Sequence, residues 1–455
     1  MIEINDTIAA ISSGLVPSAI GVIRISGPRS ISILNELIPE SRGVAPRVVR
    51  SGWVRRKEKN DNEEEKIDYV LYFYFKAPNS YTGEDMVELH GHGGKRNMER
   101  LLEVVLEKGA RLAKPGEFTM RGFLKGKIDL PRAEAVMSVV CAKSERALRA
   151  AQAQLGGVLT KEVEEIRDII VSQIARLEAG IDFPDDVEGL DLEREKLEEA
   201  EKRLETMIGK WKKSKFLSGG LKVVLSGRPN AGKSSLFNAF LGKNRALVDS
   251  EPGTTRDFIE AEMEIGGNLI TFIDTAGIRE GGSKVEAMGI KASWEVLKSA
   301  DVVLFLIDEN EIEYGQFLQI EKVSEGAVFL PLLSKSDLGW KPSTKLEKIL
   351  EGKRVIRVSV VTGEGLKELE GMLVEFAGGG LSLDEPLLLN LRHFKCVEKA
   401  LEGVRKAMAL KDEGYGEEIV VSSLKESALS MDEITGRCTS VDYLEEIFSK
   451  FCIGK

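Results

Sequence analysis

The stretch KVVLSGRPNAGKSS, residues 222–235, decides the fold of the central part of this chain. It places the spacing G-x-x-x-x-G-K-S directly after an apolar run that predicts a β-strand and directly before SLFNAFL, which predicts a helix. Glycines let backbone N–H groups close around a phosphate, Lys233 supplies positive charge, and Ser234 gives Mg²⁺ a hard oxygen ligand. We therefore expect a P-loop for a nucleoside triphosphate. The residues expected to contact the nucleotide here are Asn230, Ala231, Gly232, Lys233, Ser234 and Ser235.

Two downstream motifs supply the remaining ligands of a magnesium-bound nucleotide. PGTTRD offers Thr255 as a second Mg²⁺ ligand on a switch loop. FIDTAGI puts Asp274 at the end of a predicted strand, where its carboxylate can hold the metal through water. The rest of that motif, also expected at the nucleotide, is Thr275, Ala276 and Gly277.

A third motif, LLSKSD, predicts that the base is guanine. It resembles the guanine-reading element N-K-x-D, with Ser334 in place of asparagine, while Asp337 remains to accept hydrogen bonds from the guanine edge. Lys335 and Ser336 complete the element, and Ser359 in VSVVTGEG matches part of a later base-contacting motif. We expect the chain to remain specific for GTP although Ser334 replaces the asparagine.

The residue after DTAG is Ile278, where Ras-like GTPases carry the glutamine that orients the attacking water. Isoleucine cannot do this, so hydrolysis needs another group to position water and another source of positive charge. Glu286, in REGGSKVEAMG, is a candidate for positioning the water. An ordinary solvated glutamate is the alternative interpretation.

Composition describes a globular protein of several domains. The chain has 455 residues, of which 42% are hydrophobic and 30% charged, and its apolar runs are too short to cross a bilayer. The N-terminus shows no export signal and the four cysteines form no C-x-x-C pair, so we expect a cytoplasmic protein with reduced thiols. The net charge of −10 disfavours indiscriminate nucleic-acid binding, so any RNA contact needs local basic patches.

The periodicity of apolar residues changes along the chain and predicts four parts. Short β-type runs with one helix near 97–109 predict an α+β unit over 1–118. Apolar residues at three- and four-residue steps predict helices over 119–216 and again over 381–455, while 217–380 alternates strand and helix patterns. We therefore expect a multidomain α/β protein in which a Ras-like G domain, with a parallel-rich sheet covered by helices on both faces, is inserted into a discontinuous helical bundle.

The order of these motifs, with NDTIAAI near the start and FCIGK at the end, resembles the MnmE (TrmE) family of tRNA-modification GTPases over essentially the whole chain. The resemblance implies an N-terminal domain similar to tetrahydrofolate-binding aminomethyltransferases, through which the chain forms a homodimer. It implies that, with the FAD-dependent partner MnmG in a heterotetramer or larger complex, the chain installs an aminomethyl-type group at C5 of the wobble uridine of certain tRNAs. The carbon would come from tetrahydrofolate in its 5,10-methylene or 5-formyl form.

The resemblance also assigns a cation to the hydrolysis reaction. It implies that K⁺ supplies the missing charge, held by Asn230 and Thr254 and by backbone carbonyls at Asp249 and Glu251. It further implies that Glu286 positions water and that G domains pair across the dimer. The switch segment assigned to this role is Asp249, Ser250, Glu251, Pro252, Gly253 and Thr254.

For folate, the family pattern corresponds to Arg24, Glu88, Lys127 and the terminal Lys455. Each has a simpler interpretation, because Arg24 and Lys127 can be surface charges and Glu88 can face solvent from an alternating strand.

Cys452 in FCIGK has three interpretations. A prenylated anchor is disfavoured by the terminal Lys455 and by the mixed charge of the preceding segment. A thiol packed as a small hydrophobe is the ordinary alternative. The resemblance favours the third, a reactive thiol beside the folate carbon. A regulatory or ribosome-associated GTPase that binds RNA without folate is the competing function.

Overall fold

The chain forms two units in the computed structural model. The first unit comprises Met1–Met137 and Leu429–Lys455, and the second comprises Ser138–Ala428. The four-part division expected from the sequence stays a prediction. The structure describes residues 5–14, 16–57, 64–183, 191–243, 246–247, 259–274, 294–308, 314–339 and 343–454.

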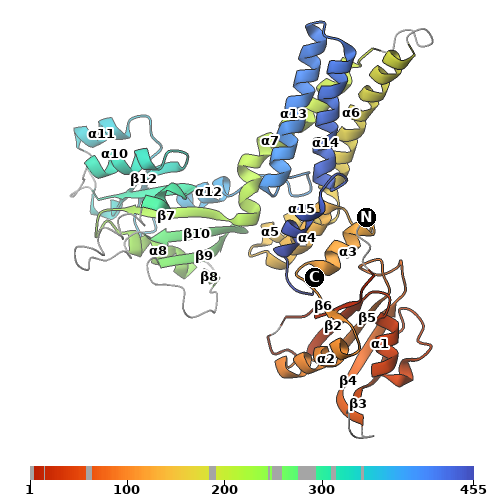
Figure 1. Ribbon diagram of the computed structural model, residues 1–455. Helices are drawn as coiled ribbons and strands as arrows, with labels where there is room; N and C mark the ends of the chain where they lie inside the picture. The colour runs from red at the N-terminus through yellow and green to blue at the C-terminus, as the bar shows by residue number, and fades with distance from the viewer. Residues whose placement is uncertain are drawn as a thin grey trace. The chain divides into compact units, whose positions relative to one another are not determined.

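A six-stranded sheet forms the core of the first unit, in the order β3-β4-β5-β2-β1-β6. Neighbouring strands pair antiparallel except β1 and β6, which are parallel. The strands are β1 (Ile8–Ile11), β2 (Ile20–Ser26), β3 (Arg50–Lys57), β4 (Glu64–Phe75), β5 (Met86–His92) and β6 (Arg111–Leu112). Apolar residues of α1 and α2 pack against one face of this sheet and form the main core of the unit (Figure 1). The helical elements of this unit include α1 (Ser30–Leu37), η1 (Pro39–Ser41), α2 (Lys95–Glu107), α3 (Glu117–Leu124) and α15 (Val441–Ser449), and α4 (Leu130–Cys141) begins in it.

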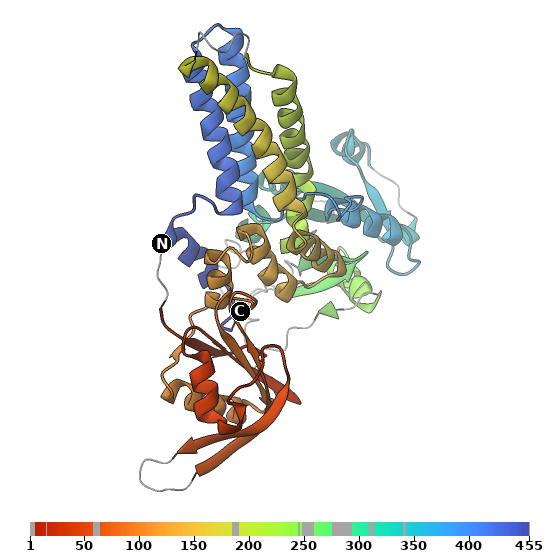
Figure 2. The same cartoon turned by 90° about the vertical axis from the view of Figure 1, so that its right-hand side faces the viewer.

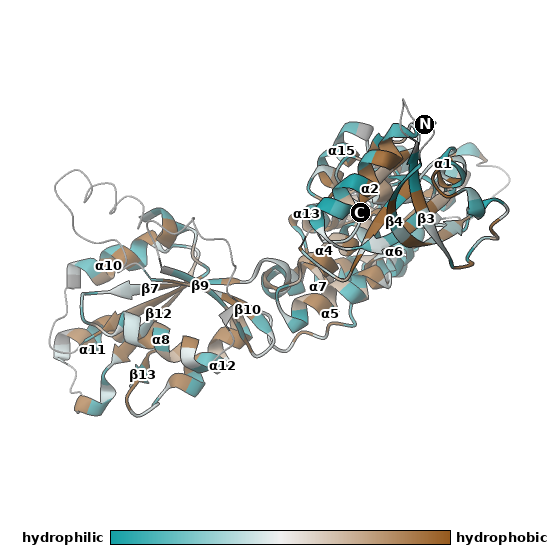
Figure 3. Cartoon of the chain, turned by 90° about the horizontal axis from the view of Figure 1, so that it is seen from below, coloured by the Kyte–Doolittle hydropathy of each residue, from teal (hydrophilic) through white to brown (hydrophobic). Residues whose placement is uncertain are grey.

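A seven-stranded sheet dominates the second unit, in the order β13-β12-β11-β7-β10-β9-β8. The strands from β13 to β10 run parallel, and β9 and β8 are added antiparallel at the edge. The strands are β7 (Leu221–Gly227), β8 (Ala246–Leu247), β9 (Ile259–Ile265), β10 (Asn268–Asp274), β11 (Val302–Ile307), β12 (Val328–Ser334) and β13 (Ile356–Val358). Their hydrophobic residues appear brown in Figure 3.

Helices cover both faces of this sheet. Leu236, Phe237 and Phe240 of α8 pack with α12 on one face, and Phe317 of α10 packs with Leu346 of α11 on the other. The helical elements with described bounds include α8 (Lys233–Lys243), α10 (Tyr314–Val323), η3 (Ser336–Leu338), α11 (Thr344–Leu350) and α12 (Leu366–Phe376). The predicted parallel-rich sheet with helices on both faces is therefore confirmed.

Long helices flank this sheet domain in the sequence. The helix α7 packs against both α13 and α6, which belong to the bundle of long helices in Figure 1 and Figure 2, and Gly403 on α13 lies against Ser423 and Ser427 of α14. The predicted apolar stripes are buried along these helices, including Val163 on α6 and Leu204 on α7. The helices are α5 (Glu145–Leu155), α6 (Val158–Asp182), α7 (Arg194–Gly219), α13 (Leu391–Asp412) and α14 (Glu417–Thr435). Among the described residues, no helix is both long and apolar enough to cross a membrane.

A buried ionic network lies in the first unit and was not expected from the sequence. Arg121 is fully buried and donates to Glu117, to Glu84 and to Asp6, at 2.9, 3.1 and 2.6 Å between nitrogen and oxygen. Burial alone would raise the pKa of the Glu117 carboxyl, but hydrogen bonds from Arg111, the Lys114 N–H group and Arg121 hold that pKa below its ordinary value. The network ties the N-terminal residues to α3.

We expect Arg121→Met to lower the free energy of unfolding of the first unit by about 3 kcal/mol or more, because it leaves buried carboxylates without a counter-charge. Arg111→Met is the matched control, since Arg111 is more exposed and the change should cost less. Because the folded-state pKa of Glu117 is lowered, its contribution is present above the unfolded value of about 4.3 and is lost as the pH falls through the folded value. Urea unfolding at neutral and acidic pH measures both effects.

Candidate functional site

The phosphate loop connects the end of β7 to the start of α8 and has a backbone that only certain residues tolerate. Gly227 has a φ of 132°, and a Cβ there would lie 2.4 Å from the carbonyl oxygen of Leu306. Gly232 has a φ of 95°, and Asn230 has a φ of 63°, a left-handed conformation that asparagine adopts more readily than most residues. The loop is therefore built from the residue types that its backbone requires.

Lys233 is buried at the first turn of α8 and lies within this loop. Its ammonium donates to the carbonyls of Gly227 and Arg228, both at 2.7 Å. Burial lowers the pKa of Lys233, while the charge of Asp274 acts in the opposite direction. A bound phosphate would place further negative charge beside this buried ammonium and favour its charged form.

Ser234 and Asp274 meet at the carboxyl ends of two inner strands of the sheet. β10 and β7 are parallel neighbours, so Asp274 at the end of β10 lies beside the P-loop, and Ser234 Oγ is 3.3 Å from Asp274 Oδ2. A hydroxyl and a carboxylate are the hard oxygen ligands that Mg²⁺ prefers. The described part of the predicted magnesium site therefore fits that ion.

The predicted base-reading motif lies at the end of β12 and is held by partners from distant segments. Ser359 Oγ donates to Asp337 Oδ1 at 2.6 Å, which fixes this carboxylate and leaves its other oxygen for a base edge. Lys335 has a φ of 58° and its ammonium contacts Asp308 at 2.5 Å. Ser336 donates to Glu364 at 2.6 Å. The sequence interpretation missed Asp308, although its position directly after the buried strand β11 was a signal.

Ser334 is buried and its hydroxyl donates to the carbonyl of Ile307 at 3.0 Å. Its Cβ lies 3.9 Å from the position of a Cβ on Gly232, so the serine borders the phosphate loop. Asparagine at this position would extend an amide further than serine extends its hydroxyl.

We expect Ser334→Asn to tighten GTP binding about fivefold, since one added hydrogen bond contributes about 1 kcal/mol. Both forms should bind ATP much more weakly than GTP, because Asp337 is unchanged. Ser299→Asn, on an exposed position, is the control. Competition against a fluorescent guanine nucleotide measures the affinities, and equal affinities of the unaltered chain for ATP and GTP would contradict the assignment.

Several predicted residues lie outside the described part of the chain. These include Ile278, the proposed water-positioning Glu286 and the terminal Lys455. The others are Asp249, Ser250, Glu251, Pro252, Gly253, Thr254, Thr255, Thr275, Ala276 and Gly277.

A second candidate site is an open pocket of about 680 Å³ in the first unit. It brings together three residues predicted for folate, Arg24, Glu88 and Lys127. Arg24 and Glu88 are cross-strand neighbours on β2 and β5, and their side chains form an ion pair at 2.9 Å. Glu88 does not simply face solvent, because its side chain is only 16% exposed.

Aromatic rings line the same pocket. The Arg24 guanidinium lies 5.1 Å from the ring centre of Tyr81, which lines the pocket, and 5.6 Å from that of the buried Phe118, which does not. Burial raises the pKa of Tyr81, against opposing effects of a hydrogen bond with Thr119 and of Arg24. Phe73 also lines the pocket. Flat apolar walls beside an arginine, a lysine and a carboxylate suit a flat heteroaromatic ring that carries hydrogen-bonding groups and an anionic tail.

The carboxy-terminal segment lies against the same unit. The Gly116 N–H group donates to the carbonyl of Cys452 at 3.3 Å, and Arg24 donates to the carbonyl of Gly454 at 3.4 Å. Phe451 is buried, but Cys452 is exposed and is a free thiol. The interpretation of Cys452 as a packed hydrophobe is therefore wrong, and the segment that contains this thiol contacts Arg24 through the Gly454 carbonyl.

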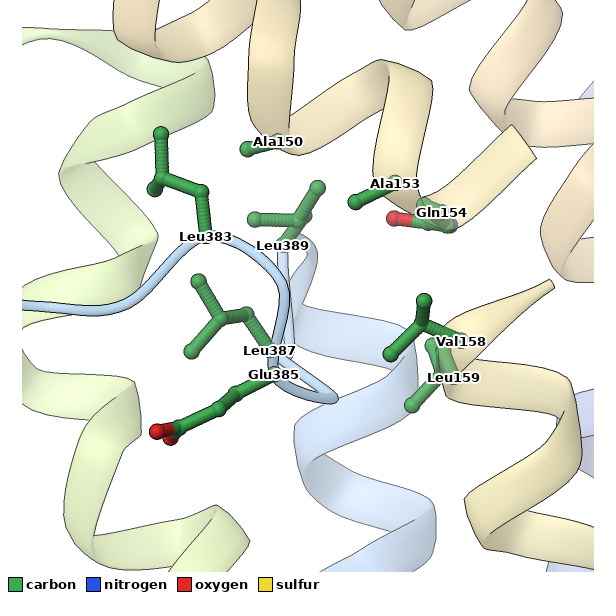
Figure 4. A pocket seen from close by; sticks show the side chains of 9 residues that line it. All are labelled: Ala150, Ala153, Gln154, Val158, Leu159, Leu383, Glu385, Leu387 and Leu389. Carbon is green, nitrogen blue, oxygen red and sulfur yellow. The ribbon is translucent and has the colours of Figure 1, made fainter. Parts of the chain in front are cut away.

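A small pocket in the second unit, shown in Figure 4, is not a candidate for either ligand. Its volume is about 10 Å³, which is room for one water at most. It is lined mainly by apolar side chains of α5, α6 and the segment before α13, including Ala150, Leu159 and Leu387.

Comparisons with known proteins match both parts of the chain. The family model described as the MnmE helical domain matches residues 130–452, and the model described as the GTP-binding protein TrmE N-terminus matches residues 7–127. A tRNA modification GTPase MnmE from Alkaliphilus metalliredigens is 38% identical, over 99% of this chain and 100% of that protein. The protein of the same name from Aquifex aeolicus is 37% identical, with the same coverage of both chains. The solved G domain of the T. maritima FeoB iron transporter is 32% identical, covering 34% of this chain and 98% of that one with a TM-score of 0.27.

Proposed function

The chain belongs to the MnmE family of tRNA modification GTPases, and we propose that it couples GTP hydrolysis to a folate-dependent modification at C5 of the wobble uridine of certain tRNAs. It is a P-loop GTP hydrolase that acts in tRNA modification. The folate chemistry, the activating cation and the protein partners are the finer parts of the proposal.

In the GTP site, Lys233 and the backbone of the P-loop bind the phosphates, and Asp337, oriented by Ser359, reads the guanine. Ser234 and Asp274 would hold Mg²⁺, with Thr255 as a further ligand. Asn230 and the switch segment from Asp249 to Thr254 would hold K⁺. The two cations would offset negative charge that develops between the β- and γ-phosphates.

In the first unit, Arg24, Glu88 and Lys127 would bind tetrahydrofolate between aromatic walls, with Lys455 reaching it from the end of the chain. The bound folate would supply the one-carbon unit. The chain's own contribution is to bind and orient the ring through the Arg24–Glu88 pair and to present the exposed Cys452 thiol beside it. That thiol would act as a nucleophile or move a proton.

We infer two protein contacts for this assembly. Trp53, Tyr69 and Leu71 on β3 and β4 are 38%, 48% and 46% exposed, an apolar face that a second copy of the chain would cover in a homodimer. Trp53 and Tyr69 contact each other directly, with ring centres 5.4 Å apart. The FAD-dependent partner MnmG would join this dimer in a cytoplasmic complex that binds tRNA.

The observation that carries the folate half of the proposal is the convergence of Arg24, Glu88 and Lys127 on one pocket, whose Arg24 also binds the carbonyl of Gly454, two residues after Cys452. A GTPase that only binds RNA has no use for a pocket of this chemistry.

Arg24→Ala is expected to abolish binding of 5-formyltetrahydrofolate and to remove the wobble-uridine modification, because it breaks the ion pair that orders the pocket. Arg96→Ala, on an exposed arginine of the same unit, is the control and should do neither. Nucleoside analysis of tRNA by mass spectrometry, from cells that lack the protein and are complemented with each form, measures the modification. If wobble uridines carry the same modification in cells that lack the protein as in cells that contain it, the result would instead favour a regulatory GTPase.

A further inference from the structure

The last glycine of the chain occupies a position that no other residue fits. Gly454 has a φ of 93°, in the region where L-residues with side chains are strained. A Cβ at Gly454 would lie 2.3 Å from the carbonyl oxygen of Ile11 on β1 and 2.8 Å from the Cα of Ser12. Both neighbours are backbone atoms of the central sheet and its first loop, so neither can move aside as a flexible side chain would.

Arg24 connects this glycine to the pocket. Its guanidinium binds the Glu88 carboxylate at 2.9 Å and the Gly454 carbonyl at 3.4 Å. The Arg24 side chain is 18% exposed and lies against the rings of Tyr81 and Phe118. One partly buried cation is thus shared between the pocket wall and the end of the chain.

The other side of the segment rests on a second constrained glycine. Gly116 precedes α3 with a φ of 65°, and a Cβ there would lie 2.6 Å from the carbonyl oxygen of Phe448. Its N–H group donates to the carbonyl of Cys452. Phe451 is buried with its ring centre 5.1 Å from that of Phe448. The backbone is held on both sides of Cys452 while the thiol itself stays exposed.

We propose that Gly454 is a positioning residue that fixes the segment Phe451–Gly454 against β1 and thereby holds the Cys452 thiol at the mouth of the Arg24 pocket. Two residues span about 7 Å at most, so the Cα of Cys452 lies within that distance of the glycine bound to Arg24. The proposal rests on the proposed function in taking this pocket as the tetrahydrofolate site. A ligand in the pocket should then shield the thiol for as long as the segment is docked.

The test compares the full-length chain with Gly454→Val and with the control Gly14→Val. Gly14 lies in the same unit, and a Cβ there meets nothing within 4 Å. The first readout is the alkylation rate of Cys452 by iodoacetamide, followed by peptide mass spectrometry with and without saturating 5-formyltetrahydrofolate. The second is trypsin cleavage after Lys450, an exposed residue followed by the buried Phe451.

We expect the ligand, added to saturation of each form at its own measured Kd, to slow alkylation about 10-fold in the unaltered chain and in Gly14→Val, and not in Gly454→Val. Without ligand, trypsin should cleave after Lys450 about 10-fold faster in Gly454→Val, because cleavage follows the population of the undocked segment. Thermal melting of the three forms checks that each is folded.

The two readouts separate the positioning role from the proposed function. Failure of the unaltered chain to bind 5-formyltetrahydrofolate would contradict the folate assignment, and faster trypsin cleavage of Gly454→Val would still support docking through Gly454. Unchanged cleavage, or ligand protection of Cys452 that persists in Gly454→Val, would show that Gly454 does not position the thiol.

Discussion

GTP hydrolysis by this chain is expected to be faster in K⁺ than in Na⁺ by on the order of 100-fold, and Asn230→Ala is expected to abolish the difference. Ile278 stands where a water-orienting glutamine would be and has no polar group. The charge that develops during phosphoryl transfer must therefore be met by something other than a side chain at that position. A monovalent cation held by Asn230 and the switch segment would meet it, and the smaller Na⁺ would fit ligands spaced for K⁺ less well.

The effect of Asn230→Ala has to be separated into loss of a K⁺ ligand and strain in the backbone of the P-loop. Asn230 has a φ of 63°, and alanine is less stable than asparagine in this conformation. Asn230→Gly removes the side chain without that strain and should lose the K⁺ effect equally. Steady-state phosphate release in matched KCl and NaCl measures the rates. Equal rates of the unaltered chain in the two salts would refute the cation assignment.

Glu286→Ala should slow this hydrolysis while leaving GTP affinity nearly unchanged, because the proposed role of Glu286 arises in the transition state. Single-turnover hydrolysis and equilibrium binding measure the two quantities separately. If Glu286→Ala hydrolyses GTP as fast as the unaltered chain, Glu286 is an ordinary solvated glutamate.

Local sequence patterns predicted the elements of the nucleotide site because each of them is short-range. The P-loop was predicted from glycines and a lysine within a few residues of one another, and its backbone angles at Gly227, Asn230 and Gly232 agree with that requirement. The stripes of α6 and α7 followed from helical periodicity alone. In each case the signal and the structure lie in the same segment.

The parts that could not be predicted from the residues alone depend on contacts between distant segments. Asp308 and Glu364 hold the base-reading motif from other segments, and although Asp308 follows a buried strand, nothing in the sequence pairs either residue with LLSKSD. The burial of Arg121 among three carboxylates depends on the packing of α3 against the N-terminal residues. An arginine in a short amphipathic helix would ordinarily be assigned to the surface.

The placement of the last residues is the clearest example of this limit. Cys452 and Arg24 are more than 400 residues apart in the sequence, yet the segment that carries the thiol binds the Arg24 guanidinium. No periodicity connects them. Only the resemblance to a family indicated that the end of the chain returns to its beginning, and the structure supplies the contacts that hold it there.

We therefore expect Cys452→Ser to abolish the tRNA modification while GTP hydrolysis and folding remain intact. The nucleotide residues belong to the second unit and Cys452 to the first, so the substitution changes no residue of the GTP site. Serine keeps the approximate size of the side chain but lacks the nucleophilicity of a thiol. Cys438→Ser removes another exposed thiol of the same unit and should leave the modification unchanged.

Nucleoside analysis of tRNA from complemented cells, together with phosphate release by the purified variants, measures the two activities. Full modification by Cys452→Ser would remove the thiol from the mechanism, and recovery of the unaltered chain in a prenylated membrane fraction would restore the lipid-anchor interpretation.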